Sequence, residues 1–172
     1  LSYALQGQEE ASKLQSMLIE TINTNAEVMC ASIGISPESI SEVCLVGNTA
    51  MHHFFLNLPI SSLSVSPFVP VTDDPLDIHA SDIGITALPG SYVFIPPVIA
   101  GFVGSDHLAF LLSSGFAKKT GRISLGIDIG TNTEIALKKN DQIVSVSTAS
   151  GPAFEGAHIK FGMRAAPGAI EH

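Results

Sequence analysis

Three successive stretches near the end of the chain restrict its fold more than any other feature. RISLGIDIG, TNTEIALKK and QIVSVSTAS, residues 122–130, 131–139 and 142–150, are short apolar and β-branched runs separated by turn residues. Runs of this length and composition are typical of β-strands, and the Asn140-Asp141 pair between the last two fits a tight hairpin. The sequence therefore predicts three strands joined by two turns.

Helix-like and strand-like segments alternate in the chain before these strands. From Gln8 to Ile33 apolar residues recur at steps of three and four, which predicts a long amphipathic helix that stops at Gly34. EVCLVG and SYVFIPPV are predicted as buried strands, and NTAMHHFFLNL and AGFVGSDHLAFLLSSG as the helices that follow them. The proline-rich segment 60–89 is predicted to be extended, with one short helix at 79–83. This order indicates an α/β fold.

The composition argues against several classes of function. The formal net charge is −8 and no cluster of Lys and Arg is visible, so binding to nucleic acid through its phosphates is not expected. The two cysteines, Cys30 and Cys44, match no metal-binding or disulfide spacing, and a cytoplasmic location is the simplest setting. No apolar run is long enough to cross a bilayer, so no membrane association is expected. With 45% apolar and 14% charged residues, part of the surface is expected to face another segment or subunit.

Asp128 stands at the end of a predicted strand, and the turn after it contains Gly130, Thr131, Asn132 and Thr133. Turn amides and hydroxyls can donate to phosphate oxygens, and a carboxylate at a strand end can hold the hydrated Mg²⁺ that accompanies them. Taken alone, so short a motif favours an Asp-Gly turn between two ordinary strands. The wider sequence context has to decide between these interpretations.

Two further places carry candidate site residues. Asp106 stands at the expected start of a helix whose free amides would face a cleft, where its carboxylate could orient a water molecule or simply cap its own helix. Gly151 and Glu155 lie about a strand end and a helix start. A glycine there permits close approach of a phosphate, and Glu155 could contact a metal-bound water or favour the helix dipole.

Other polar residues have ordinary structural explanations beside functional ones. His52 and His53 adjoin on a predicted helix and point in different directions, so they are expected to be solvent-facing or satisfied core histidines rather than a metal pair. Asn48 and Thr49 could present polar groups to a cleft or cap the helix. Arg164 could contact a phosphate or a partner, or form a surface ion pair.

The segment LGIDIGTNTEIAL resembles the second phosphate motif of the actin-like ATPase superfamily, which includes sugar and acetate kinases, actins and heat-shock chaperones. Together with VGNTAMHHFFLNLP, IAGFVGSDHLAF and STASGPAFEGAHIKFGMRAAPGAIE, it closely resembles the large domain of the reductive activators of corrinoid proteins. The resemblance implies part of an actin-like, ribonuclease H-like α/β fold. Residues 1–120 would form the latter part of the first lobe with the connecting helix, and residues 121–172 the start of the second lobe with its phosphate-binding hairpin.

The resemblance also implies cofactors, partners and roles for single residues. ATP and Mg²⁺ would be the cofactors, and a corrinoid protein or methyltransferase subunit the partner, with a homodimer as a further option. The reaction would be the reduction of cobalt(II) to cobalt(I) for methyl transfer. Asp128 would bind the metal, Asp106 lies near the position of a catalytic acid in heat-shock chaperones, and the nucleotide would contact Asp128, Gly130, Thr131, Asn132, Thr133, Gly151 and Glu155.

Two parts of that family have no counterpart in this sequence, namely the two-iron ferredoxin domain and a first Asp-x-Gly-Thr hairpin. The chain begins at Leu1 without a methionine and stops soon after a densely patterned stretch, so we expect a fragment. ATPase activity is accordingly expected of the full-length protein and not of this fragment. A non-catalytic docking lobe for a corrinoid protein or another subunit, and an actin-fold small-molecule kinase, remain as alternatives.

Overall fold

The computed structural model describes residues 1–118, 121–130 and 132–150 of the chain. The chain divides into two compact units, Leu1–Ser113 and Ser114–His172. The first unit combines helices with a small sheet and the second is built on a three-stranded sheet, which makes the protein a mixed α/β chain with two small sheets.

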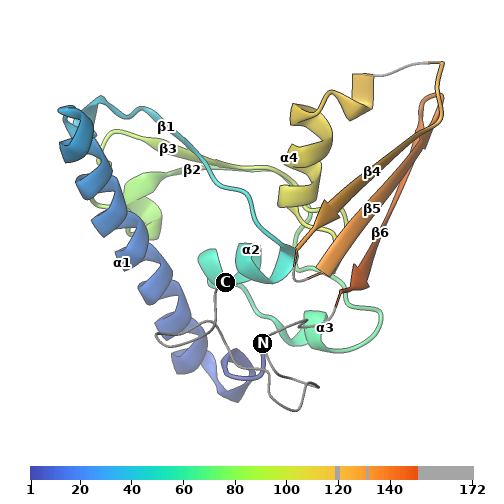
Figure 1. The fold of residues 1–172 in the computed structure, drawn as a ribbon. Helices are drawn as coiled ribbons and strands as arrows, with labels where there is room; N and C mark the ends of the chain where they lie inside the picture. Colours follow the sequence, from blue (N-terminus) through green and yellow to red (C-terminus); the bar gives the residue numbers. More distant parts are fainter. Residues whose placement is uncertain (119–120, 131, 151–172) are drawn as a thin grey trace, which may run out of the picture. The chain divides into compact units, whose positions relative to one another are not determined.

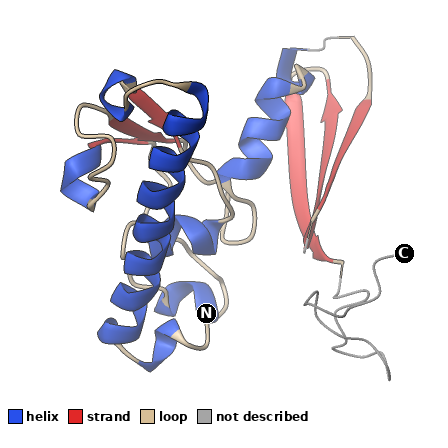
Figure 2. Ribbon diagram, turned by 60° about the vertical axis from the view of Figure 1, so that its left-hand side comes forward, coloured by secondary structure: helices blue, strands red, loops and turns tan. Residues whose placement is uncertain are grey.

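The first unit is dominated by the helix α1, Gln8–Ile33, which both ribbon views show alongside a small sheet (Figures 1 and 2). The predicted bounds of this helix are confirmed. It ends at Gly34, which has a φ of 71° and donates its N–H to the carbonyl of Ala31, while the N–H of Ile35 reaches the carbonyl of Cys30. Glycine adopts this left-handed conformation without the steric penalty of a Cβ atom, so the helix stops where the sequence predicted.

The sheet beside α1 has the strand order β1-β3-β2, with β1 at Glu42–Cys44, β2 at Leu76–His79 and β3 at Tyr92–Ile95. β1 is parallel to β3, and β2 is antiparallel to it. The strand β2 corrects the prediction of an extended segment with only a short helix, because its four residues become a strand through pairing with β3, a contact that local sequence does not reveal. The short helix is confirmed as the 3₁₀-helix η3 at Ala80–Ile83.

The predicted burial of the first sheet is only partly right. In β3, Val93 and Ile95 are fully buried, whereas Tyr92 and Phe94 on the other face are 53% and 37% exposed. One face of the sheet therefore packs into the core and the other does not. The buried members of this core come from α1, α2, β3 and the segment between β2 and β3, and they are Ile19, Phe55, Ala80, Ile85, Ala87, Leu88, Val93 and Ile95.

Short helices complete the first unit. The helix α2 spans Thr49–Phe55, close to its predicted bounds. The helix α4 spans Ser105–Ser113 and begins later than predicted, because Ala100 and Val103 pair with each other in a turn before it. A one-turn helix, α3, at Ser61–Ser64 was not predicted. Three further 3₁₀-helices lie at Ala4–Gln6 (η1), Pro37–Ser39 (η2) and, in the second unit, Phe116–Lys118 (η4).

Cys30 is buried in α1 and Cys44 is exposed at the end of β1, and both are free thiols. Among the described residues, none of the helices combines the length and the apolar character that a membrane span requires.

The sheet of the second unit consists of β4 at Ser124–Ile129, β5 at Asn132–Lys139 and β6 at Gln142–Ala149, and all neighbouring strands are antiparallel. Figure 2 draws these strands as long red arrows. The three predicted strands are thus confirmed, as is the hairpin turn at Asn140, where φ is 56° and the flanking residues of β5 and β6 pair directly.

The two faces of this sheet differ in chemistry because successive side chains of a strand point to opposite sides. One face, called here the apolar face, carries Leu125, Ile127, Ile129, Ile135, Leu137, Val144 and Val146, of which all but Ile135 are at least 44% exposed. The opposite face, called here the polar face, includes Ser124, Gly126, Asp128, Asn132, Glu134, Ala136, Lys138, Ser145 and Ser147.

Candidate functional site

The turn between β4 and β5 holds the first group of predicted site residues. Asp128 is half-buried near the end of β4, and the N–H of Gly130 donates to the carbonyl of Asn132 at 2.9 Å. A Cβ atom on Gly130 would lie 3.2 Å from the same carbonyl oxygen, so the turn is tight. The amide of Gly130 is engaged inside the turn and is not the free donor that the sequence predicted.

The register of the sheet separates two residues that the prediction had grouped. Asp128 and Asn132 belong to the polar face, whereas Thr133 lies opposite Ile129 on the apolar face. The Thr133 hydroxyl forms a hydrogen bond with the Ser150 hydroxyl. The carboxylate of Asp128 and the amide of Asn132 can therefore serve one ligand on the polar face, and the role predicted for Thr133 stays a prediction.

A residue that the sequence reasoning missed lies directly across from Asp128. Asp128 of β4 pairs with Glu134 of β5, and Glu134 pairs in turn with Ser147 of β6. The Ser147 hydroxyl donates to Oε1 of Glu134 at 3.0 Å. The signal was present in the sequence, because a tight hairpin after Asp128 places the alternate residues of the next strand on the same face of the sheet.

The donor set on this part of the polar face suits a hydrated Mg²⁺ ion. Two carboxylates and a hydroxyl are hard oxygen groups, and their neighbours Gly126 and Ala136 are small. Within the residues that the structure describes, no group of three or more His, Cys, Asp or Glu side chains is placed to hold a metal. Mg²⁺ itself uses one or two protein carboxylates and completes its shell with water and phosphate.

The start of α4 holds Asp106, the predicted catalytic residue. The N–H groups of Ser105 and Asp106 both donate to the carbonyl of Gly47, at 3.0 and 3.4 Å, and the N–H of His107 donates to Oδ1 of Asp106 at 2.9 Å. The expectation of free amides at this helix start is therefore wrong for these three residues. Asp106 satisfies an amide of its own helix, which favours the capping interpretation, and its catalytic role stays a prediction.

Close contact joins the starts of α4 and α2. A Cβ atom on Gly104 would come within 2.4 Å of the Gly47 carbonyl oxygen, so the backbones approach too closely for any side chain there. The Ser105 hydroxyl accepts the N–H of Gly47 at 3.1 Å. We call the contact between Gly47, Gly104 and Ser105 the helix-start joint.

Asn48 and Thr49 have structural roles at the start of α2. The Asn48 side chain accepts the N–H of Met51 at 2.9 Å, which confirms the N-cap interpretation. The hydroxyl of Thr49, which is buried, donates to the carbonyl of Ala100 at 2.7 Å. The contacts occupy the side-chain oxygen of Asn48 and the hydroxyl of Thr49.

The two histidines of α2 are both buried, at 1% and 0% exposure, so the solvent-facing alternative is wrong. His53 is a satisfied core histidine. Its Nδ1–H donates to the carbonyl of Thr49 at 2.8 Å, since a carbonyl only accepts, and its Nε2 accepts the N–H of Val71 at 2.9 Å. His52 has no hydrogen-bond partner for either ring nitrogen among the described residues. Burial lowers the pKa of both rings, and for His52 the neighbouring His53 lowers the pKa further.

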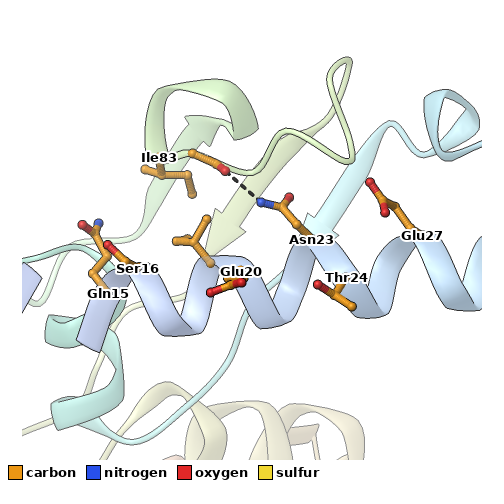
Figure 3. Close-up of a pocket in the computed structure, with 9 residues that line it drawn as sticks. Gln15, Ser16, Glu20, Asn23, Thr24, Glu27 and Ile83 are labelled. Carbon is orange, nitrogen blue, oxygen red and sulfur yellow. Dashed lines mark hydrogen bonds between the residues drawn. The ribbon is translucent and has the colours of Figure 1, made fainter. Parts of the chain in front are cut away.

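A shallow groove of about 590 Å³ along α1 contains none of the predicted site residues (Figure 3). The Asn23 side chain crosses its edge, donating to the carbonyl of Gly84 and accepting the N–H of Ala87, both at 3.0 Å. Glu20 and Glu27 line the groove, and no Lys or Arg is among the described residues that do so. The negative charge of this groove repels phosphate, so the groove is not a nucleotide site. The hydrogen bonds of Asn23 instead connect α1 to the loop after η3.

Several predicted residues lie outside the residues that the structure describes, namely Thr131, Gly151, Glu155 and Arg164. Their assignments remain predictions. The described candidates fall into separate units, with Asp106 in the first and Asp128, Gly130, Asn132, Thr133 and Glu134 in the second.

Comparison with known proteins covers both units. Residues 1–119 match the family model described as the RACo middle region, and residues 122–172 match the model described as the C-terminal domain of RACo, the ASKHA domain. The chain is similar to a solved structure entitled reductive activator for corrinoid, iron-sulfur protein, with a TM-score of 0.82 and 35% identity, over 98% of this chain and 27% of that one.

Two curated proteins are also similar along nearly the whole chain. The corrinoid activation enzyme RamQ of Eubacterium limosum is 36% identical over 171 residues, which are 99% of this chain and 28% of that protein. The Co(II) methylated amine-specific corrinoid protein reductase of Methanosarcina barkeri is 32% identical over 179 residues, 99% of this chain and 32% of that protein. The chain thus spans less than a third of the length of these relatives.

Proposed function

The chain belongs to the RACo family, and on that premise we propose that it supplies part of the ATP-binding module of a protein that drives reduction of a corrinoid protein from cobalt(II) to cobalt(I). One observation carries the proposal. A half-buried carboxylate, Asp128, stands at the end of a strand before a tight glycine turn, inside the segment that matches the ASKHA domain. The oxygen donors around it suit Mg²⁺, the usual companion of bound ATP.

The residues of this chain would divide the work as follows. Asp128 would hold the cation, and the exposed Asn132 on the same face would donate its side-chain amide to a phosphate oxygen. When bound, Mg²⁺ neutralises the charge that the phosphates carry and fixes their geometry. Thr131, Gly151 and Glu155 are proposed to add contacts to the nucleotide, and Asp106 to orient a water molecule.

We also propose that the chain is part of an actin-like fold with two lobes. Residues 1–120 would complete a first actin-like lobe with its connecting helix, and residues 121–172 would begin a second. Because the chain spans less than a third of its curated relatives, nucleotide binding and reduction are proposed for the whole protein, with a corrinoid protein or methyltransferase subunit as its partner.

The apolar face favours a second candidate function. Six of its side chains are at least 44% exposed, and a contiguous apolar patch on a protein surface is typical of an interaction site. A lobe that docks a corrinoid protein or another subunit without binding nucleotide would use such a face. Only the ATP-binding function requires the carboxylate of Asp128, as a ligand of Mg²⁺.

The test is a calorimetric titration of ATP with Mg²⁺ on the full-length protein. We expect Asp128→Asn to weaken Mg²⁺-dependent ATP binding at least about tenfold, since it removes a charged ligand of the cation. Asp141→Asn, which removes the same charge from the exposed β5–β6 turn, is the matched control and should bind like the wild type. Equal ATP binding by wild type and Asp128→Asn would remove the metal assignment, whereas no ATP binding by the wild type would leave the docking lobe. Cobalt(I) formation with a corrinoid protein and ATP, followed by its absorption spectrum, tests the reaction.

A further inference from the structure

The pairing of Asp128 with Glu134 is an arrangement that antiparallel sheets normally avoid. Side chains directly opposite in such a sheet have Cβ atoms about 5 Å apart, and like charges in these positions destabilise the sheet. Both residues are half-buried, so water screens their repulsion less than it would at a fully exposed site. A positive charge from outside the sheet would offset the repulsion between these two carboxylates.

The described cations do not supply the missing charge. Lys138 lies on the same face of β5 as Glu134, but four residues along a strand correspond to about 13 Å. Its ammonium group is buried and donates to the carbonyl of Ala117 in η4. Lys138 therefore provides no cationic partner for Asp128 or Glu134.

The orientation of Glu134 is set from its other side. Ser147 of β6 donates its hydroxyl to Oε1 of Glu134 at 3.0 Å, which leaves Oε2 available for another donor. The next position along the polar face, at Gly126 and Ala136, is buried, whereas Gly130 and Asn132 on the turn side of the pair are exposed, so solvent reaches the two carboxylates from the turn. A fixed carboxylate that solvent reaches is well placed to accept a hydrogen bond from a metal-bound water.

We propose that Glu134 is the second acid of the Mg²⁺ site, which accepts a hydrogen bond from a water of the cation while Asp128 binds the cation. This inference rests on the proposed function, because the ion arrives with ATP. It adds that the cation also relieves the repulsion between the two carboxylates, and that Ser147 is a positioning residue that acts through Glu134.

The experiment measures ATP affinity of the full-length protein by calorimetry, with and without saturating Mg²⁺, and compares the ratio of the two affinities. In Glu134→Gln this ratio should fall about tenfold or more, since loss of a group that orients a metal ligand typically costs 10–100-fold in metal affinity. Ser147→Ala should lower the ratio less, and Asp141→Asn not at all. A second readout is thermal: without metal, Glu134→Gln should melt no lower than the wild type, but Mg²⁺ with ATP should raise its midpoint less.

The possible failures are distinguishable. If Glu134→Gln and Ser147→Ala keep the wild-type ratio while Asp128→Asn loses it, Glu134 has no part in the site and the proposed function stands. If the wild-type protein binds no ATP, the proposed function falls and this inference falls with it. A metal-free melting point of Glu134→Gln well below that of the wild type would show that Glu134 is needed for the sheet and overturn the repulsion argument.

Discussion

Exchanging each of the two neighbouring histidines of α2 for methionine should change stability in opposite directions. His52 and His53 are equally buried on the same short helix, and methionine is a better helix former than histidine at both positions. Methionine also adapts to irregular space in a core. The two substitutions therefore differ mainly in the hydrogen bonds that they remove.

The structure gives the size of each effect. His53→Met loses the bonds to the Thr49 carbonyl and the Val71 amide, each worth about 1 kcal/mol, for a cost of about 2 kcal/mol. His52→Met removes a buried ring whose nitrogens have no hydrogen-bond partner among the described residues, which should raise the stability of the folded state by about 1–3 kcal/mol. Imperfect packing of the methionine reduces this gain by up to about 1.5 kcal/mol.

Native-state hydrogen exchange of the α2 amides in the full-length protein at pH 7.5 reports the opening free energy of this helix directly. We expect a difference of about 3 kcal/mol between the two variants, with His52→Met the more stable. Equal destabilisation by both substitutions would show that the ring of His52 has a partner in solution, and the reasoning from its unpaired nitrogens would be wrong.

Two other expectations concern the same unit. The opening free energy of wild-type α2 should fall as the pH drops below 6.5, because the pKa of both histidines is lowered in the folded state and the unfolded state then binds more protons. Hydrogen-exchange data corrected for the intrinsic rate at each pH should show a shallower fall in His52→Met than in the wild type. An opening free energy that does not change with pH in the wild type would contradict the lowered pKa of these histidines. Gly104→Ala should destabilise the protein by about 1–3 kcal/mol in urea denaturation, since its methyl group would meet the Gly47 carbonyl, whereas Gly90→Ala, where nothing lies within 4 Å, should be nearly neutral.

The elements that the sequence predicted well are those whose signals are local. Gly34 ends α1 through its own backbone conformation, and Asn140 turns the β5–β6 hairpin in the same way. The strand β2 was missed because Leu76–His79 becomes a strand only by pairing with β3, and the prolines around it pointed to an irregular segment.

The candidate site shows a similar division. Asp128 could be predicted from its place in a short motif, whereas Glu134 acquires its interest only through the register that puts it opposite Asp128. Thr133 was grouped with Asp128 because they are close in sequence, but one residue of offset sends a side chain to the other face of a sheet. The occupied amides at the start of α4 depend on Gly47, more than fifty residues earlier, and no local pattern could indicate that contact.

The helix-start joint has a mechanical consequence. One carbonyl, that of Gly47, receives two amides of α4, and the next residue, Asn48, caps α2. With no side chain on Gly104 to act as a spacer, the two helix ends cannot slide past each other without breaking several hydrogen bonds at once. The starts of α2 and α4 should therefore move together, so that a displacement of either helix also displaces the other.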